Sequence, residues 1–520
     1  MDNFYITTPI FYVNDRPHIG HAYNMTASDV LARFMRLSGH NVKFLTGTDE
    51  HGQKVEKSAA KAGMPPQQFV DQVSQHFRDL TKLLNISNDD FIRTTEPRHV
   101  AGAQGMWKVM IEKGYIYLGS YAGWYAVRDE AFYAESELVD GKAPTGADVE
   151  WVEEPSYFFK LSAFGDKLLE FYEKHPDFIL PASRRNEVVS FVKGGLKDLS
   201  VSRTTFKWGI PVPGDEKHIM YVWLDALVNY LSAVGYPDTN VAEYKKFWPA
   251  MHMVGKDILR FHAVYWPAFL MAAELPLPRV FAHGWLTIEG EKMSKSLGNV
   301  IAPADLINTF GLDQTRFFLL RTAPFGNDFS FSYERMANVI NAELANNIGN
   351  LAQRTLSMIH KNCGGLVPDH ASVAKDELDL AFLGKVQVTQ SSTPKEVEKA
   401  YRECRFNDIL GDIVAIASEA NLYIDSKAPW KQKKVDEKLM QATLYHLAEA
   451  IRCIAIMLQP FMPGSAAKLL TTLGYPEAQA QKGISFSELT PEHALKVGAQ
   501  LLPPEPLFPK IEVAASAGAA

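Results

Sequence analysis

The order of patterns over the first fifty residues most limits the fold. Residues 4–13, FYITTPIFYV, are rich in β-branched and aromatic side chains and predict a buried strand. Apolar residues then recur at helical spacing from His21 to about Ser38, before Gly39 as a stop. VKFLTG at 42–47 predicts a second strand. Strand, helix and strand in this order indicate a doubly wound, parallel-sheet α/β domain of Rossmann type, with ligands at the strand carboxyl ends.

A chain of 520 residues is too long for one ordinary core, so we expect several folding units. After about Phe331 the pattern is almost wholly helical, with three long helices that predict a separate α-helical bundle. The predicted parts are the first half of the α/β domain at 1–119, an inserted connective subdomain of short strands and turns at 120–203, the second half at 204–290, a loop and linking region at 291–335, the bundle at 336–505, and a C-terminal arm and tail at 506–520.

Composition excludes some classes of protein. With 47% hydrophobic and 22% charged residues, the chain resembles a globular protein. The longest apolar stretch, from Phe261, is too short to span a membrane, and the N-terminus lacks a basic targeting region, so we expect a cytoplasmic enzyme. The three cysteines lie far apart and predict buried thiols in helices. The net charge of −7 does not exclude a local basic surface for nucleic acid.

Two histidines flank a short turn in NDRPHIGHAY, where the first strand ends and the helix begins. A helix N-terminus directs N–H groups and partial positive charge toward such a turn, which favours phosphate. His18 and His21 could donate hydrogen bonds to phosphoryl oxygens, and Gly20 leaves room for a nucleotide. A histidine pair that only caps the helix is the alternative, and it is preferred in the absence of a partner motif.

A partner motif occurs at 289–299, EGEKMSKSLGN, which carries Lys292 and Lys295. Lysines on a loop after a strand can reach a polyphosphate and neutralise the charge on a leaving pyrophosphate. A solvated surface loop is the default for any two lysines, but it is the weaker interpretation beside the first motif.

HIGH and KMSKS resemble the two signatures of the class I aminoacyl-tRNA synthetases. TTPIFYVNDRPHIGHAY, FLTGTDEHG, YVWLDALVNY, GKDILRFHAVYWP and KMSKSLGNV are similar, in order, to the methionyl-tRNA synthetase family, and the resemblance covers residue 4 to beyond 430. It implies a methionine–tRNA ligase that makes methionyl-adenylate and pyrophosphate from methionine and Mg²⁺-ATP. The methionyl group then passes to the 3′-terminal adenosine of initiator or elongator tRNA(Met). The region at 291–335 would hold the KMSKS loop and contact the tRNA stem.

The resemblance also implies residue roles. His18, His21, Lys292 and Lys295 would hold the phosphates and the transition state, and Gly20, Gly255 and Asp257 would complete the ATP site. Aromatic rings hold a thioether well. Asp49 would take the methionine ammonium group, and the Ile10 backbone and Tyr230 hydroxyl would meet the sulfur. Core packing is the alternative for each ring, and for Phe261 and Trp266 both interpretations are equally favoured. The remaining pocket residues are Tyr12, Trp223, Ala226 and His262.

The helical segment would read the anticodon by stacking and by hydrogen bonds to base edges. Asn350 and Arg354 are four residues apart, hence on one helix face, and Trp430 precedes three lysines. All three match anticodon-reading positions of the family. For Trp430 alone, burial is the commoner explanation.

Two departures from many relatives lead to further expectations. The stretch GWYAVRDEAFY has no cysteine where relatives carry zinc knuckles, so we expect a zinc-free insertion held by Trp124, Tyr125, Phe132 and Tyr133. Few residues follow EPLFPK, which leaves no room for a dimer-forming barrel and predicts a monomer.

Rival functions lack their own features. Synthetases for large aliphatic amino acids need a larger editing insertion, and the cysteine enzyme needs zinc held by thiolates. A non-catalytic tRNA-binding relative would not need both lysines. A small-molecule nucleotidyltransferase would not need the helical bundle.

Overall fold

The computed structural model describes residues 2–13, 15–129, 131–293, 299–371, 375–391 and 394–512. The chain divides into two compact units. We call Asn3–Ser28 with Val42–Gly284 the sheet unit, and Met1–Asp2, Asp29–Asn41 and Trp285–Ala520 the helical unit. The boundary therefore falls once within the long helix α1 (Ile19–Leu37) and once after the first residue of β3 (Asn41–Asp49), and each unit is described by itself.

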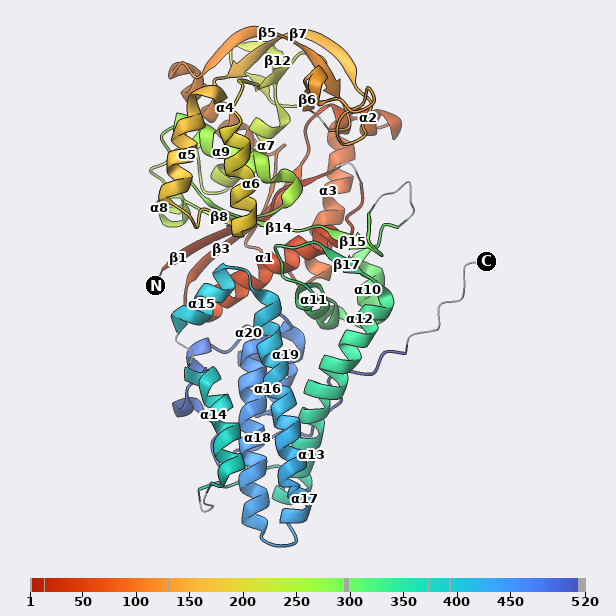
Figure 1. Cartoon of the computed structure of the whole chain (residues 1–520), viewed down its shortest axis with the longest axis vertical. Helices are drawn as coiled ribbons and strands as arrows, with labels where there is room; N and C mark the ends of the chain where they lie inside the picture. The colour runs from red at the N-terminus through yellow and green to blue at the C-terminus, as the bar shows by residue number, and fades with distance from the viewer. Residues whose placement is uncertain are drawn as a thin grey trace, which may run out of the picture. The chain divides into compact units, whose positions relative to one another are not determined.

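The sheet unit is built on a seven-stranded sheet, in which β2, β3, β1, β13, β14 and β8 follow one another and β4 pairs with β3. Figure 1 labels β1, β3, β8 and β14 of this sheet. The β1–β13, β13–β14, β14–β8, β2–β3 and β3–β4 pairs are all parallel. This arrangement confirms the predicted parallel α/β fold. The strands are β1 (Asn3–Thr7), β2 (Phe11–Tyr12), β3 (Asn41–Asp49), β4 (Asp90–Arg93), β8 (Ile179–Leu180), β13 (Met251–Gly255) and β14 (Arg279–His283).

Helices of the sheet unit pack their apolar stripes against this sheet and one another. In α3 the buried residues Val70, Ser74, Phe77 and Leu80 recur every three or four positions, as one helix face requires. The α-helices that follow α1 in this unit are α2 (Gln53–Lys61), α3 (Pro66–Leu83), α4 (Pro97–Glu112), α5 (Gly165–Lys174), α6 (Ala182–Lys193), α7 (Val222–Ser232), α8 (Ala242–Phe247) and α9 (Trp266–Ala272).

The prediction of one continuous strand at 4–13 is wrong. The segment forms β1 and β2, which pair with different strands, β13 and β3. Pro9 lies between them and has no N–H for a sheet ladder, so the ladder is interrupted there. The break lets the chain cross from the centre of the sheet to its β2 end before the histidine turn.

The segment expected to hold short strands and turns contains longer elements. β5 (Ile116–Ala126) and β7 (Glu150–Phe159) pair along most of their length, with β6 (Ala131–Tyr133) and β9 (Leu199–Ser200) at the sides. α5 and α6 follow, and β8 between them joins the main sheet. A further small sheet contains β10 (Ser202–Arg203), β12 (Asp215–Met220) and β11 (Pro211–Val212).

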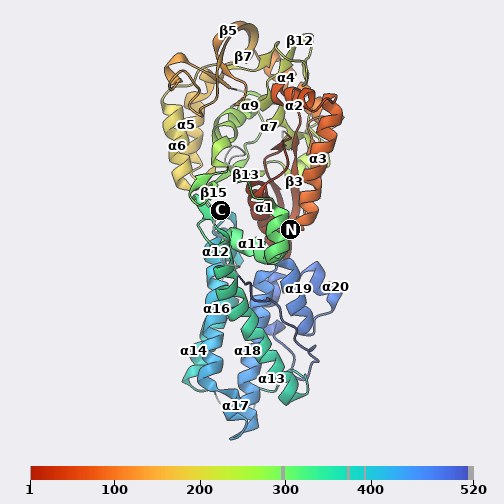
Figure 2. The same ribbon diagram turned by 90° about the vertical axis from the view of Figure 1, so that its right-hand side faces the viewer.

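The helical unit begins with a small sheet of β15 (Leu286–Ile288), β16 (Glu291–Lys292) and β17 (Phe329–Phe331). Its long helices α13, α16 and α18 lie side by side (Figure 2) and confirm the predicted bundle. The helices are α10 (Pro303–Phe310), α11 (Leu312–Arg321), α12 (Tyr333–Val339), a π-helix (Ile340–Gly349), α13 (Asn350–Cys363), α14 (Glu377–Ser391), α15 (Pro394–Arg402), α16 (Phe406–Lys427), α17 (Pro429–Gln432), α18 (Glu437–Leu458), α19 (Pro463–Thr472) and α20 (Glu477–Lys482).

The second of the three predicted long helices is interrupted. Cys404 adopts a left-handed backbone conformation with φ of 53°, which separates α15 from α16. Helical periodicity on both sides hides such a break, because one non-glycine residue in this conformation has no pattern of its own. The expectation of three buried thiols in helices is therefore only partly right: Cys404 is buried in a turn, Cys453 is buried in α18, and Cys363 is only half-buried.

Tyr401 is fully buried in an aromatic cluster where its ring stacks on Phe34 with centroids 3.7 Å apart. Its hydroxyl has no hydrogen-bond partner among the described residues, so folding dehydrates it without compensation. We expect Tyr401→Phe to raise the free energy of unfolding by about 1 kcal/mol. Urea denaturation measures the change, and a loss of stability would show that the hydroxyl is satisfied in solution.

Candidate active site

His18, Gly20 and His21 lie where β2 is followed by the N-terminus of α1. The backbone N–H of His18 donates to His21 Nδ1 at 3.0 Å, and that of Gly20 donates to His18 Nδ1 at 3.1 Å. Since Nδ1 accepts in both rings, each neutral imidazole carries its proton on Nε2. Burial lowers the pKa of His18 to about 4 and that of His21 well below its ordinary value, so both rings are neutral at pH 7. The turn thus offers two neutral N–H donors at a helix N-terminus.

The carboxyl ends of β3 and β13 supply the next predicted residues. Asp49 ends β3 and is buried, and Gly255 ends β13 and is followed by Asp257. At Gly255 an added Cβ would come within 2.5 Å of Asp257 Oδ1, so a side chain there would displace that carboxylate. Both strands belong to the parallel sheet, whose carboxyl ends share one edge.

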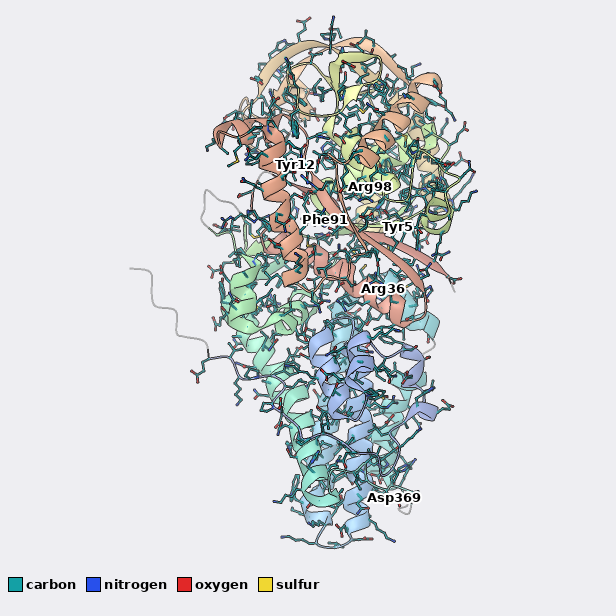
Figure 3. All side chains as sticks on the ribbon, turned by 180° about the vertical axis from the view of Figure 1, so that it is seen from behind. Tyr5, Tyr12, Arg36, Phe91, Arg98 and Asp369 are labelled. Carbon is teal, nitrogen blue, oxygen red and sulfur yellow. The ribbon has the colours of Figure 1, made fainter. Side chains whose placement is uncertain are left out.

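Predicted pocket residues gather from three segments of the sheet unit. The rings of Trp223 and Phe261 stack with centroids 3.7 Å apart and planes inclined by 5°. Tyr12, labelled in Figure 3, comes from β2, and its hydroxyl donates to the carbonyl of His51 at 3.2 Å. The remaining members divide by burial: Ala226, Tyr230, His262 and Trp266 are buried, whereas Ile10, Tyr12, Trp223 and Phe261 keep some exposure.

A hydrogen-bond chain fixes the buried side of this pocket. Tyr230 O–H lies 2.7 Å from His262 Nε2, and His262 Nδ1 lies 3.0 Å from the carbonyl of Ile258. A carbonyl only accepts, so Nδ1 carries the proton and Nε2 accepts from Tyr230. Burial lowers the pKa of His262 to about 4, which agrees with a neutral ring. The Tyr230 hydroxyl is therefore held in one orientation.

A second chain, missed by the sequence analysis, orients Trp266. Its indole Nε1 donates to His252 Nε2 at 3.2 Å, and His252 Nδ1 is 2.9 Å from Thr7 Oγ1. Indole nitrogen only donates, so the proton of His252 is on Nδ1 and points to Thr7. In the sequence, this chain could have been suspected only from His252, a polar residue in the otherwise apolar strand before GKD.

Backbone geometry brings Phe261, His262 and Trp266 to the pocket from one short segment. Phe261–Tyr265 form a π-helical turn that continues directly into α9. Such wide turns are rare and frequently occur at functional sites, because they change which residues share a helix face.

The lysine motif belongs to the helical unit. Lys292 ends β16, which pairs with β15, and its side chain lies outside the described part of the chain. Lys295 also falls outside the described residues.

Asn350, Arg354 and Trp430 come from α13 and α17 of the helical unit. Arg354 Nη2 donates to Asp425 Oδ1 at 2.6 Å, and the guanidinium carbon lies 5.8 Å from the Trp430 ring centroid. Trp430 follows Ala428, whose left-handed conformation ends α16, and is 43% exposed. Asn350 is exposed too. The ring is thus open to solvent rather than a core residue.

The inserted sheet is held partly by the residues expected to do so. The Trp124 and Trp151 rings meet edge to face at 5.3 Å, Tyr125 is buried, and Tyr133 donates to Asp129. The side chain of Phe132 lies outside the described residues. Among the residues described, no group of three or more His, Cys, Asp and Glu side chains is arranged to hold a metal ion.

No described helix combines the length and apolar character needed to cross a membrane.

Residues 4–149 and 137–356 match the family described as tRNA synthetases class I (M), and residues 377–518 match the anticodon binding domain of methionyl tRNA ligase. The methionine–tRNA ligase of Rickettsia bellii is 58% identical over 98% of this chain and 99% of its own. That of Brucella suis is 53% identical, over 98% of each.

The fold agrees with these matches. The Mycobacterium tuberculosis methionyl-tRNA synthetase in complex with methionyl-adenylate superposes with a TM-score of 0.93 at 47% identity, over 98% of this chain and 100% of that chain. Its apo form gives a TM-score of 0.86 at 44% identity, over 99% of each. By sequence over nearly its whole length and by fold, the chain belongs to the methionine–tRNA ligases of the class I tRNA synthetase family.

Proposed function

We propose that the chain joins L-methionine to the 3′-terminal adenosine of initiator and elongator tRNA(Met) in two steps. A methionine carboxylate oxygen attacks the α-phosphorus of ATP, and the bond to the β-phosphate oxygen breaks to release pyrophosphate. A ribose hydroxyl of the terminal adenosine then attacks the adenylate carbonyl, and AMP leaves. The observation that carries the proposal is the pair of neutral Nε2–H donors on His18 and His21 at the helix N-terminus.

In the first step these donors stabilise charge that develops on the phosphates. Neutral imidazoles fixed by backbone hydrogen bonds need no reorganisation when that charge appears. Lys292 and Lys295 supply positive charge to the pyrophosphate, and Mg²⁺ accompanies the ATP. Gly20 allows close approach of the nucleotide, and Gly255 and Asp257 contact the adenosine.

The methionine side chain occupies the aromatic pocket. Tyr12, Trp223, Phe261 and Trp266 surround the thioether, and Asp49 binds the ammonium group. Ala226 leaves space on α7, and the Ile10 backbone and the oriented Tyr230–His262 pair meet the sulfur. Because both hydrogen-bond chains are internally satisfied, Tyr230 and Trp266 are held in place before the substrate arrives.

Residues 336–505 read the anticodon, with Asn350 and Arg354 as hydrogen-bonding groups and Trp430 as a stacking platform. The exposed Trp430 ring beside the Arg354 guanidinium supports this role, because bases stack on aromatic rings and on guanidinium planes.

We expect Trp430→Ala to lower kcat/KM for tRNA by about 5- to 150-fold, since stacking of one base contributes roughly 1–3 kcal/mol. Pyrophosphate exchange should be unchanged, because it requires no tRNA. Leu380→Ala, which truncates another exposed apolar side chain of the helical unit, is the matched control and should leave both activities unchanged. An equal loss of exchange would instead indicate a folding defect.

The same proposal includes a zinc-free, monomeric enzyme that acts in the cytoplasm. The absence of cysteine from residues 120–203 supports the first part. One atom of zinc per chain by metal analysis would contradict it, and a dimeric mass at micromolar concentration in sedimentation would contradict the second part.

The decisive test of substrate is exchange of labelled pyrophosphate into ATP, run separately with each of the twenty amino acids. Methionine should support the fastest exchange. A different best substrate would overturn the proposed reaction.

A further inference from the structure

A buried carboxylate joins three segments of the sheet unit. Asp225 in α7 is fully buried and accepts two hydrogen bonds from histidines. Its Oδ2 lies 2.7 Å from His51 Nδ1, and its Oδ1 lies 2.6 Å from His99 Nε2. His51 lies on the loop after β3, and His99 lies in the first turn of α4. One side chain thus ties that loop to two helices.

The hydrogen bonds assign the protons. Two imidazole nitrogens lie 2.7 and 2.6 Å from the two oxygens of Asp225, as expected for an ionised carboxylate that accepts a hydrogen bond at each oxygen. An ionised carboxylate only accepts, so His51 carries a proton on Nδ1. In the neutral ring Nε2 is then an acceptor. It makes no hydrogen bond to any residue that the structure describes.

His51 also lies next to the proposed methionine pocket. It follows Asp49 by two residues, and its carbonyl accepts from the Tyr12 hydroxyl. Its partner Asp225 directly precedes Ala226 on α7 and follows Trp223 by two residues. His51 is only 6% exposed. Its ring nitrogen Nε2 nevertheless forms no hydrogen bond to the described residues, so it has no structural role there.

We propose that His51 is a further methionine-binding residue, whose unprotonated Nε2 accepts a hydrogen bond from the substrate ammonium group beside Asp49. This inference rests on the proposed function, which places the ammonium group at Asp49. Asp225 and His99 are positioning residues, because they keep the proton of His51 on Nδ1 and leave Nε2 as the acceptor. A carboxylate that selects an imidazole tautomer plays the same part in hydrolase triads.

The test compares two ligands that differ only in the ammonium group, methionine and 4-(methylthio)butanoate. Equilibrium binding to the full chain is followed by tryptophan fluorescence. In His51→Phe, the Kd of methionine should rise about 10- to 100-fold, as for loss of a hydrogen bond to a charged group. The Kd of the analogue should change less than about threefold. His51→Asn provides a second variant, which should show the same difference between the two ligands.

Equal weakening of both ligands, or no weakening of either, would overturn the inference. His446→Phe is the matched control, because it removes a buried, hydrogen-bonded histidine of the helical unit and should leave both affinities unchanged. Asp49→Asn, measured in parallel, separates the inference from the proposed function. If Asp49→Asn discriminates between the ligands and His51→Phe does not, the ammonium site stands and the role of His51 fails.

Asp225→Asn tests the positioning role. An amide can accept from only one of the two histidines, so the other ring must change its tautomer or lose its bond. Methionine binding should weaken more than analogue binding, with KM for methionine raised and kcat of exchange nearly unchanged. The double variant with His51→Phe should bind methionine no more weakly than His51→Phe alone, whereas additive losses would show that Asp225 does not act through His51.

Discussion

Loss of the His21 imidazole should lower the rate of adenylate formation by about 10²- to 10³-fold, as removal of one preorganised donor does elsewhere. His21→Leu keeps the volume of the side chain and removes the Nε2–H donor. Because methionine binding does not depend on this donor, its Kd should stay within about threefold. Pyrophosphate exchange measures the rate, and fluorescence titration measures the binding.

The donor itself, rather than the ring, is tested by His21→Asn, whose amide N–H should restore part of the rate. His175→Leu replaces an exposed histidine of the same unit and serves as the control. If His18 and His21 act on the same phosphates, as proposed, the double variant with His18→Leu should lose less than the product of the two single losses. A parallel rise in the Kd of methionine would instead show that His21 supports the pocket as a whole.

The strand–helix–strand opening and the turn that carries His18 and His21 could be predicted because their signals are local. The periods of strand and helix, the glycine at position 20 and the change of pattern after Tyr12 all occur within about forty residues. The breaks at Pro9 and Cys404 were missed for the opposite reason. In each, one residue interrupts a pattern that continues on both sides.

The sequence could not reveal the hydrogen-bond partners that orient the pocket. Thr7 and His252 are 245 residues apart, and His51 and Asp225 are 174 residues apart. No spacing rule connects such pairs, and each polar residue looks like an isolated exception in an apolar segment. Motif similarity predicted side chains of the methionine pocket, such as Tyr230 and Trp266. It did not indicate His252, which hydrogen-bonds to Trp266, or the contact between Tyr230 and His262.

A buried ion pair in the helical unit shows the same dependence on distant partners. Asp29 and Arg316 are both fully buried, and Arg316 Nη2 lies 2.7 Å from Asp29 Oδ2. Arg33 Nε approaches the same oxygen at 2.7 Å. Arg316 also donates to the carbonyls of Pro460 and Phe461, so its guanidinium joins α1, α11 and the turn before α19.

We expect Asp29→Leu to lower the free energy of unfolding by about 3–5 kcal/mol, because it leaves the Arg316 guanidinium buried without its carboxylate. The double variant Asp29→Leu/Arg316→Leu should be more stable than Asp29→Leu, since the fully buried guanidinium is removed and Arg33, whose side chain is 21% exposed, keeps contact with solvent. Glu403→Ala, which breaks exposed contacts of 3.8 Å with Lys399 and 3.2 Å with Arg405, is the control and should cost less than about 0.5 kcal/mol. Urea denaturation measures these three variants and the single variant Arg316→Leu. If the free energy of unfolding falls in the double variant by the sum of the two single losses, the two side chains stabilise the unit independently. The loss in Asp29→Leu is then not caused by breaking the ion pair.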